Sequence, residues 1–154
     1  MRIRKLAIVG ALLVLHGIGT SAEPTEWEQL VGRWKVVERA GKLDYPWDYI
    51  NKNGWVVIAK DKATLLIKEG DKEMKLAEFN VKLDATAKPK KVELTVTYIA
   101  PEGEKAKEKG TKLAGIYELK DDTIKLLIGD AKDPPKAFPD KDEGVSMLKR
   151  EKAK

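Results

Sequence analysis

The chain has 154 residues and no Cys, and its 30 Lys and Arg against 25 Asp and Glu give a formal net charge of +5. This length suits a single domain, and the lack of Cys excludes disulfides and thiol chemistry. The only dense basic cluster, residues 88–91, is too short for a nucleic-acid footprint, so we expect no nucleic-acid partner.

The first 22 residues have the organisation of a secretory signal peptide. Arg2, Arg4 and Lys5 precede an apolar run at residues 6–15, and the segment ends in small residues at Ala22. An apolar run of ten is shorter than the ~20 residues that cross a membrane. We therefore expect cleavage after Ala22 and a periplasmic or extracellular mature chain of residues 23–154, with no membrane anchor.

Cleavage at this point would change the chemistry available to the protein. The leader holds the only His, His16, and three of the basic residues, so the mature chain keeps 27 basic and 25 acidic residues and a net charge of +2. It also keeps a single Ser, Ser146. Without His or Cys, the usual activated Ser and Cys nucleophiles are excluded, and we predict a protein that is not an enzyme.

A short helix is expected at the start of the mature chain. Thr25-Glu-Trp-Glu28 forms a capping box, in which the Thr25 hydroxyl and the Glu28 carboxylate each accept from the other's backbone N–H. Gly32 follows at a place suited to a left-handed C-terminal cap. These signals predict a helix over residues 26–31, which is too short to be stable alone.

The rest of the chain has the pattern of short strands. β-branched and aromatic residues alternate with polar ones and are separated by turn residues, which indicates an all-β barrel or sandwich. The predicted strands cover residues 32–40, 54–60, 64–68, 74–83, 92–99, 113–119, 123–128 and 145–149. Residues 41–53 and 129–144 are richer in Pro and turn residues, so we expect irregular connections there.

Several motifs resemble those of known families. Gly32-Arg-Trp34 after a short helix is similar to the G-x-W opening of lipocalins and related calycins, and Leu148-Lys-Arg150 resembles their closing Arg. A fuller set resembles a planctomycete-type family of small exported domains of uncharacterised function. That set comprises Leu30-x-Gly-x-Trp-x-Val-Val37, Gly41-Lys42, Lys88-Pro-Lys90, Gly115-Ile-Tyr-Glu-Leu119, Thr123-Ile-Lys-Leu126 and Phe138 before Leu148-Lys-Arg150.

The resemblance implies an eight-stranded antiparallel lipocalin-like barrel with a short N-terminal helix. It also implies that Arg150 on the last strand lies over Trp34 on the first strand as a cation–π pair. Such a pair could clamp a ligand, but a structural role at the closed end of the barrel is the better interpretation.

Two sets of aromatic residues are candidate ligand-binding residues. Phe79, Tyr98 and Tyr117 face inward if their strands alternate strictly, and they form either plain core or the wall of a cavity. Tyr45, Trp47, Tyr49 and Trp55 fall where the first long connection meets the second predicted strand. In lipocalin-like barrels that connection is the lid over the open end, so these aromatic residues could cap a hydrophobic ligand or simply cover the mouth of the barrel.

We therefore predict non-catalytic binding of a small apolar or amphipathic molecule, or of an envelope protein, at the open end of the barrel. Two alternatives stay open: a structural or interaction domain with a filled barrel, and a carboxylate- or Lys-dependent enzyme. No motif indicates a cofactor or a metal, and the sequence does not indicate the oligomeric state.

Overall fold

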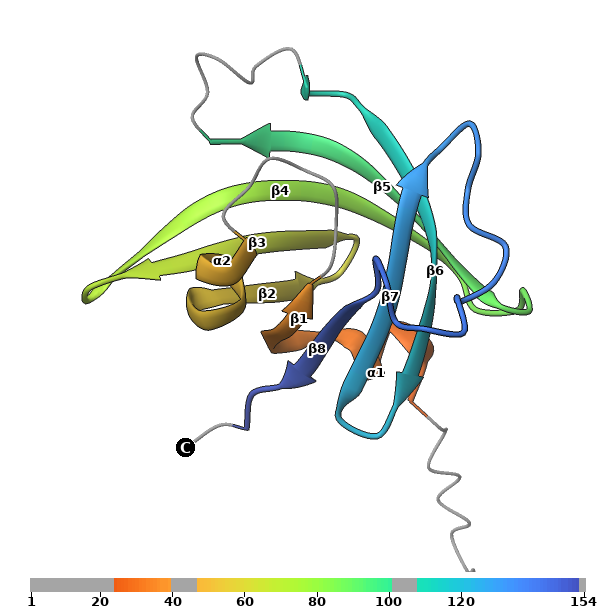
Figure 1. Cartoon of the computed structure of the whole chain (residues 1–154), viewed down its shortest axis with the longest axis horizontal. Helices are drawn as coiled ribbons and strands as arrows, with labels where there is room; N and C mark the ends of the chain where they lie inside the picture. The colour runs from red at the N-terminus through yellow and green to blue at the C-terminus, as the bar shows by residue number, and fades with distance from the viewer. Residues whose placement is uncertain (1–23, 40–46, 101–107, 153–154) are drawn as a thin grey trace, which may run out of the picture.

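A computed structural model describes residues 24–39, 47–100 and 108–152. Within these residues the chain forms two short helices and eight strands (Figure 1). Each strand pairs antiparallel with the next, and β8 returns to β1, so the sheet closes into an all-β, lipocalin-like barrel as predicted. The elements are α1 (Glu26–Leu30), β1 (Gly32–Arg39), α2 (Trp47–Asn53), β2 (Gly54–Ala59), β3 (Lys62–Glu69), β4 (Lys72–Asp84), β5 (Lys90–Ile99), β6 (Lys112–Lys120), β7 (Thr123–Asp130) and β8 (Ser146–Arg150).

Tight turns join three of the strand pairs. The β2–β3, β3–β4 and β6–β7 turns contain residues with positive φ, namely Asp61 at 59°, Gly70 at 61° and Asp121 at 51°. Gly adopts this left-handed backbone without a steric penalty, and Asp tolerates it better than most residues. The turn residues that separated the predicted strands therefore also make the hairpins possible.

The N-terminal helix α1 begins as the sequence predicts. The Glu28 N–H donates to the Thr25 hydroxyl at 3.3 Å, and the Thr25 N–H donates to the Glu28 carboxylate at 2.6 Å. The end of the helix differs from the prediction. Gly32 has φ 143°, so it does not form a left-handed cap and instead begins β1 in a backbone conformation that few other residues adopt.

The second helix, α2, was not predicted. It covers the end of the stretch that we expected to be irregular, and it packs against β1, β2 and β3. Among the helix residues whose side chains are described, Ile50 is the buried one, with 1% of its surface exposed. A Cβ on Gly54 would lie 2.4 Å from the Ile50 carbonyl oxygen, so only Gly allows the helix to run directly into β2. This packing is tertiary, and local sequence signals do not reveal it.

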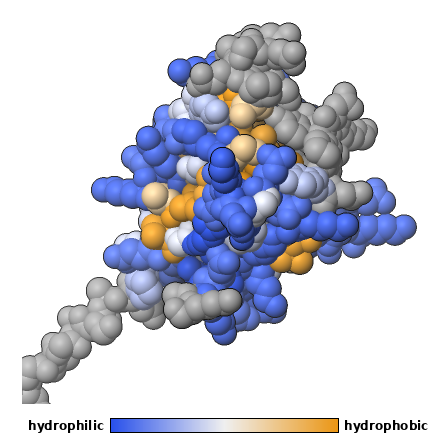
Figure 2. Space-filling view, turned by 90° about the vertical axis from the view of Figure 1, so that its left-hand side faces the viewer, coloured by the Kyte–Doolittle hydropathy of each residue, from blue (hydrophilic) through white to orange (hydrophobic). Residues whose placement is uncertain are grey.

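The long connection between β7 and β8 is irregular, as predicted. It lies along the outside of the barrel near β7, where Lys125 pairs with Asp142 at 2.7 Å and lies over the Phe138 ring at 4.9 Å (Figure 1). The face of the molecule shown in Figure 2 is largely hydrophilic, with hydrophobic side chains visible between the charged ones. Apolar side chains are concentrated in the barrel interior, where Trp34, Val36, Leu65 and Leu148 are buried.

Candidate ligand-binding cavity

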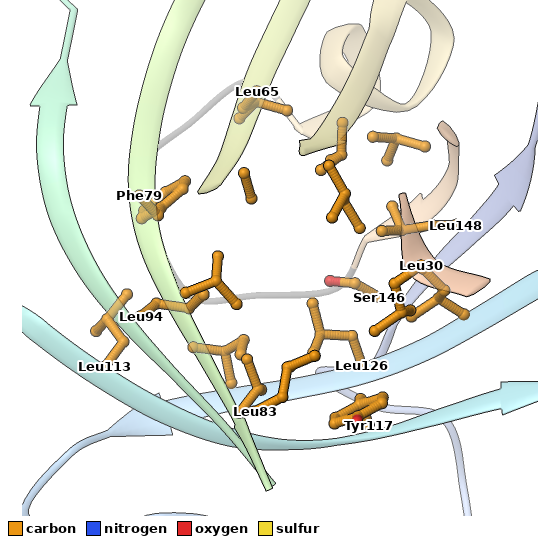
Figure 3. A pocket seen from close by; sticks show the side chains of 18 of the residues that line it. Leu30, Leu65, Phe79, Leu83, Leu94, Leu113, Tyr117, Leu126, Ser146 and Leu148 are labelled. Atoms are coloured by element: carbon orange, nitrogen blue, oxygen red, sulfur yellow. The ribbon is translucent and has the colours of Figure 1, made fainter. Parts of the chain in front are cut away.

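The barrel interior contains a cavity of about 360 Å³ (Figure 3). Every strand contributes to its wall, and α1 contributes two side chains. Alternate residues of a strand point to the same face, which is why pairs such as Val56 and Ile58 both line the cavity. The lining residues are Trp27, Leu30, Val36, Val56, Ile58, Ala63, Leu65, Phe79, Val81, Leu83, Val92, Leu94, Leu113, Tyr117, Ile124, Leu126, Ile128, Gly129, Gly144, Ser146 and Leu148.

The side chains that line this cavity are mostly hydrocarbon. Among the described residues that line it, only Trp27, Tyr117 and Ser146 have a polar side-chain atom, and none is charged. The Ser146 hydroxyl points toward the middle of the cavity (Figure 3). An apolar wall with a few polar groups is the usual character of a small-molecule site.

Tyr117 is the most deeply buried of the three polar side chains, with 3% of its surface exposed. Its hydroxyl oxygen is shielded from both solvent and the cavity, and it lies near the Glu26 carboxylate without a hydrogen bond of good geometry to any described residue. Burial raises the pKa of Tyr117 well above its ordinary value, and the nearby Glu26 carboxylate raises it further. The phenol therefore stays protonated at physiological pH and keeps a hydrogen that it can donate.

The cavity is closed at one end by α1, and this helix is held by Arg150. The Arg150 guanidinium lies 4.2 Å from the centre of the Trp34 ring, which is the stack that the resemblance implies. It also donates to the carbonyl of Val31 at 3.2 Å and to that of Gln29, at the end of α1. The Trp34 indole N–H donates to the Leu30 carbonyl at 2.8 Å. These contacts favour a structural role for the pair.

Phe79 and Tyr117 line the cavity, but Tyr98 does not. The register between β4 and β5 shifts between Glu78 and Phe79, so Phe79 lies opposite Val96 while Glu78 lies opposite Tyr98. One extra residue, Thr97, therefore interrupts the alternation, and Tyr98 lies on the outside with the Lys75 ammonium 4.4 Å from its ring. Strict alternation predicted the wrong face for Tyr98 because it took no account of this bulge.

The described aromatic residues of the expected lid do not line the cavity. Val56 and Ile58 point inward, so Trp55 faces outward, where Lys35 lies 3.8 Å and Arg33 lies 5.0 Å from its ring. Tyr49 is 37% exposed and donates from its hydroxyl to the Lys68 carbonyl at 3.2 Å.

The other two residues of the expected lid are not described in the same detail. Tyr45 lies outside the described residues, and Trp47 begins α2 without a described side chain.

Two polar residues of the cavity were not among the predicted site residues. Trp27 lies within the capping-box helix, and its position in the wall depends on how α1 packs across the barrel end. Ser146 is the only Ser of the predicted mature chain and begins β8. Its alternation with Leu148 on β8 is the signal that could have placed it inside the barrel.

Comparison of the chain with protein-family models, with curated proteins and with solved structures finds no match. In the part of the chain that the structure describes, no cluster of His, Cys, Asp or Glu could hold a metal ion. No helix among the same residues has the length and apolar character needed to cross a membrane. The fold and the cavity define the class of protein as a small β-barrel domain with a largely apolar interior cavity.

Proposed function

We propose that this protein binds a small apolar or amphipathic molecule inside its barrel. The observation that carries this proposal is the cavity of about 360 Å³, whose lining side chains are apolar except for Trp27, Tyr117 and Ser146. Eight-stranded barrels are just wide enough either to be filled by side chains or to hold one small ligand. The cavity favours binding over a filled barrel, and the lack of charged lining residues gives the enzymatic alternative no support.

The size of the cavity limits the ligand. At about 30 Å³ for each water-sized group, it has room for roughly a dozen non-hydrogen atoms. This volume lies near the lower end of the range for small-molecule sites, roughly 300–1,000 Å³. Each methylene group transferred from water to such a wall contributes about 0.8 kcal/mol, which corresponds to about a fourfold gain in affinity.

We also propose that this binding takes place in the periplasm or outside the cell. The support is the sequence of residues 1–22, whose basic start, short apolar run and small-residue end are typical of a cleaved leader. An apolar molecule has a low solubility in the water of either compartment. A domain that carries or senses such a molecule would therefore be useful there. An envelope protein is the other partner that the sequence analysis left open.

The experiment is a calorimetric titration with linear primary alcohols of six to sixteen carbons. We expect affinity to rise about fourfold per methylene group and to stop rising near a dozen non-hydrogen atoms, when the cavity is full. Ala63 lines the cavity, so Ala63→Phe should fill part of it and weaken binding of the longer alcohols. Ala59→Phe is the matched control, because Ala59 is exposed on the neighbouring strand.

Two results of this titration would overturn the proposal. The interior is not a ligand site if no alcohol binds, or if both Phe variants bind every alcohol with the same affinity as the wild type. The domain would then act through its outer surface, as a structural or interaction domain. Urea midpoints of both variants show whether each is folded under the conditions of the titration.

A further inference from the structure

Strand β7 is longer than its pairing with β8. It runs from Thr123 to Asp130, but the register with β8 ends where Leu126 pairs with Ser146. Among the described residues, no strand continues the ladder beside residues 127–130 on that side. Figure 1 shows the arrow of β7 extending past the point where β8 begins. The ladder that closes the barrel therefore stops short of the end of β7 and leaves a gap between the two strands.

The cavity reaches this gap. On the other strands, no two consecutive residues line the cavity, as the alternation of side chains requires. On β7, the consecutive residues Ile128 and Gly129 both line it. Gly129 pairs with Ala114, the neighbour of the lining residue Leu113, so Gly129 belongs to the outer face of the sheet. An outward-facing residue that borders the interior indicates that the cavity extends around the edge of β7 at this place.

Two glycines border the cavity at the gap, near the two ends of the β7–β8 connection. Gly144, which shortly precedes Ser146, is the one described lining residue outside the strands and α1. A Cβ on Gly129 would lie 3.1 Å from the Cδ atom of Pro135, and Gly144 has a φ of 79°, which favours Gly. Neither position carries a side chain that could fill the gap, so backbone forms its border.

The opposite end of the cavity is closed by α1 and by the contacts that hold this helix. Leu30 of α1 is 4% exposed, and Trp34 is completely buried. From β8, Arg150 donates to the carbonyls at the end of α1, and from β5, Lys90 forms an ion pair with Glu26 at 2.8 Å. A ligand that entered there would have to displace a helix that is held from two strands.

The two ends of the cavity also differ in their access to water. Trp27 and Leu30 line the α1 end, and no described lining residue is charged. Ser146 lies at the gap, and its hydroxyl points into the cavity (Figure 3). A polar group of a ligand loses free energy when it is buried without a partner, whereas at an opening it keeps its contact with water. A ligand with one polar end is therefore most stable with that end at the gap.

We propose that the ligand enters the cavity between β7 and β8, through an opening bordered by Ile128, Gly129, Gly144 and Ser146. The ligand has one polar end, which stays at this opening, and an apolar tail that lies toward α1. This inference rests on the proposed function and narrows the ligand to a single-headed amphiphile, such as an alcohol, a monoacylglycerol or an alkyl glycoside. The cavity limits the tail to about a dozen non-hydrogen atoms but sets no such limit on the head.

The first test measures thiol reactivity in the protein without ligand. The chain has no Cys, so each single substitution introduces the only thiol. Ser146→Cys places it at the opening, Ala63→Cys in the cavity near α1, and Lys149→Cys on the exposed face of β8. Ala63 lies near α1 because it pairs with Ile58, which pairs with Gly32 at the start of β1.

Each variant reacts with the small N-methylmaleimide and with fluorescein maleimide, which has more non-hydrogen atoms than the dozen or so that the cavity can hold. The ratio of the large reagent's rate to the small reagent's rate cancels differences in thiol pKa, because both reagents attack the same thiolate. We expect this ratio to be at least about tenfold lower in Ala63→Cys than in Ser146→Cys, and highest in Lys149→Cys. If Ser146→Cys fails to fold, Ile128→Cys on the other side of the opening takes its place.

The second test measures the position of the polar end. Calorimetry compares decanol with decyl glucoside, which has the same tail and a head too large to share the cavity with it. We expect the two affinities to agree within about tenfold, because the common tail contributes most of the binding free energy. Saturating decyl glucoside should slow the reaction of N-methylmaleimide with Ser146→Cys by at least about tenfold and leave Lys149→Cys unchanged.

Other outcomes would overturn the inference in distinguishable ways. If the rate ratio for Ala63→Cys equals or exceeds that for Ser146→Cys, or if fluorescein maleimide reacts with neither, the ligand does not enter between β7 and β8. If decanol binds and decyl glucoside does not, the cavity encloses the whole ligand, and the proposed function stands without this orientation. If no alcohol binds, the proposed function fails and this inference fails with it.

Discussion

Replacement of Arg150 by Leu tests how the closed end of the barrel is held. The Arg150 side chain stacks on Trp34 at 4.2 Å, donates to the carbonyls of Gln29 and Val31, and lies 3.2 Å from the Asp122 carboxylate. One guanidinium thus joins β8 to the end of α1 and to the first strand. Leu keeps part of the apolar contact with Trp34 but makes none of the polar contacts.

The expected loss of stability can be worked out from these contacts. The cation–π contact contributes about 0.5–2 kcal/mol. A hydrogen bond from a charged donor contributes about 1.5–3 kcal/mol when it is well buried. The side chain of Arg150 is 27% exposed, so water replaces part of what is lost. We therefore expect Arg150→Leu to lower the free energy of unfolding by about 2–4 kcal/mol.

Equilibrium unfolding in urea measures this loss. With a slope of about 2 kcal/mol per molar urea, in the middle of the usual range for small proteins, the midpoint should fall by roughly 1–2 M. Lys149→Leu is the matched control, because Lys149 is the exposed neighbour on β8 and its replacement should change stability by at most about 0.5 kcal/mol. Equal midpoints for the two variants would refute the reasoning, since Arg150 would then add nothing beyond an ordinary surface charge.

Three further predictions follow from the sequence and the fold. Trp27 lines the cavity and Trp55 does not, so Trp27→Phe should reduce the change in tryptophan fluorescence on binding of a linear alcohol more than Trp55→Phe does. The reverse order would place the ligand outside the barrel. A Cβ on Gly115 would lie 2.2 Å from the Leu127 carbonyl oxygen, so Gly115→Ala should lower the urea midpoint by at least as much as Arg150→Leu. If the Gly115→Ala variant had the same midpoint as the wild type, that result would contradict the close packing of β6 against β7. Intact-mass analysis of the exported protein should give a chain that begins at Glu23, and a product that retains residues 1–22 would contradict the leader.

The strands and the first helix were predictable because their signals are local. Alternation of apolar and polar residues reports which face of a strand is buried, and the predicted strands agree with the observed ones to within a few residues. The capping box of Thr25 and Glu28 is likewise contained within four residues, so it needs no tertiary contact to be recognised.

The errors arise where a distant segment decides the conformation. Helix α2 exists because Ile50 packs against the barrel and Gly54 lets the chain turn directly into β2. Tyr98 faces outward because of a bulge in its pairing with β4, and a single strand's sequence carries no mark of its partner's register. Gly32 begins a strand instead of capping a helix, and the Arg150 guanidinium lies where its side chain would be.

The sequence by itself determined the number of strands, the start of α1 and the exclusion of thiol and histidine chemistry from the predicted mature chain, because each depends on composition or on neighbouring residues. Only the tertiary structure decided that the barrel interior contains a cavity and that Tyr117, Leu126 and Ser146 form one row of its wall. A cavity is the volume left when all the inward side chains have been placed, and a row across three strands depends on two registers at once. Neither quantity belongs to any single stretch of sequence, so both appear only when the barrel closes.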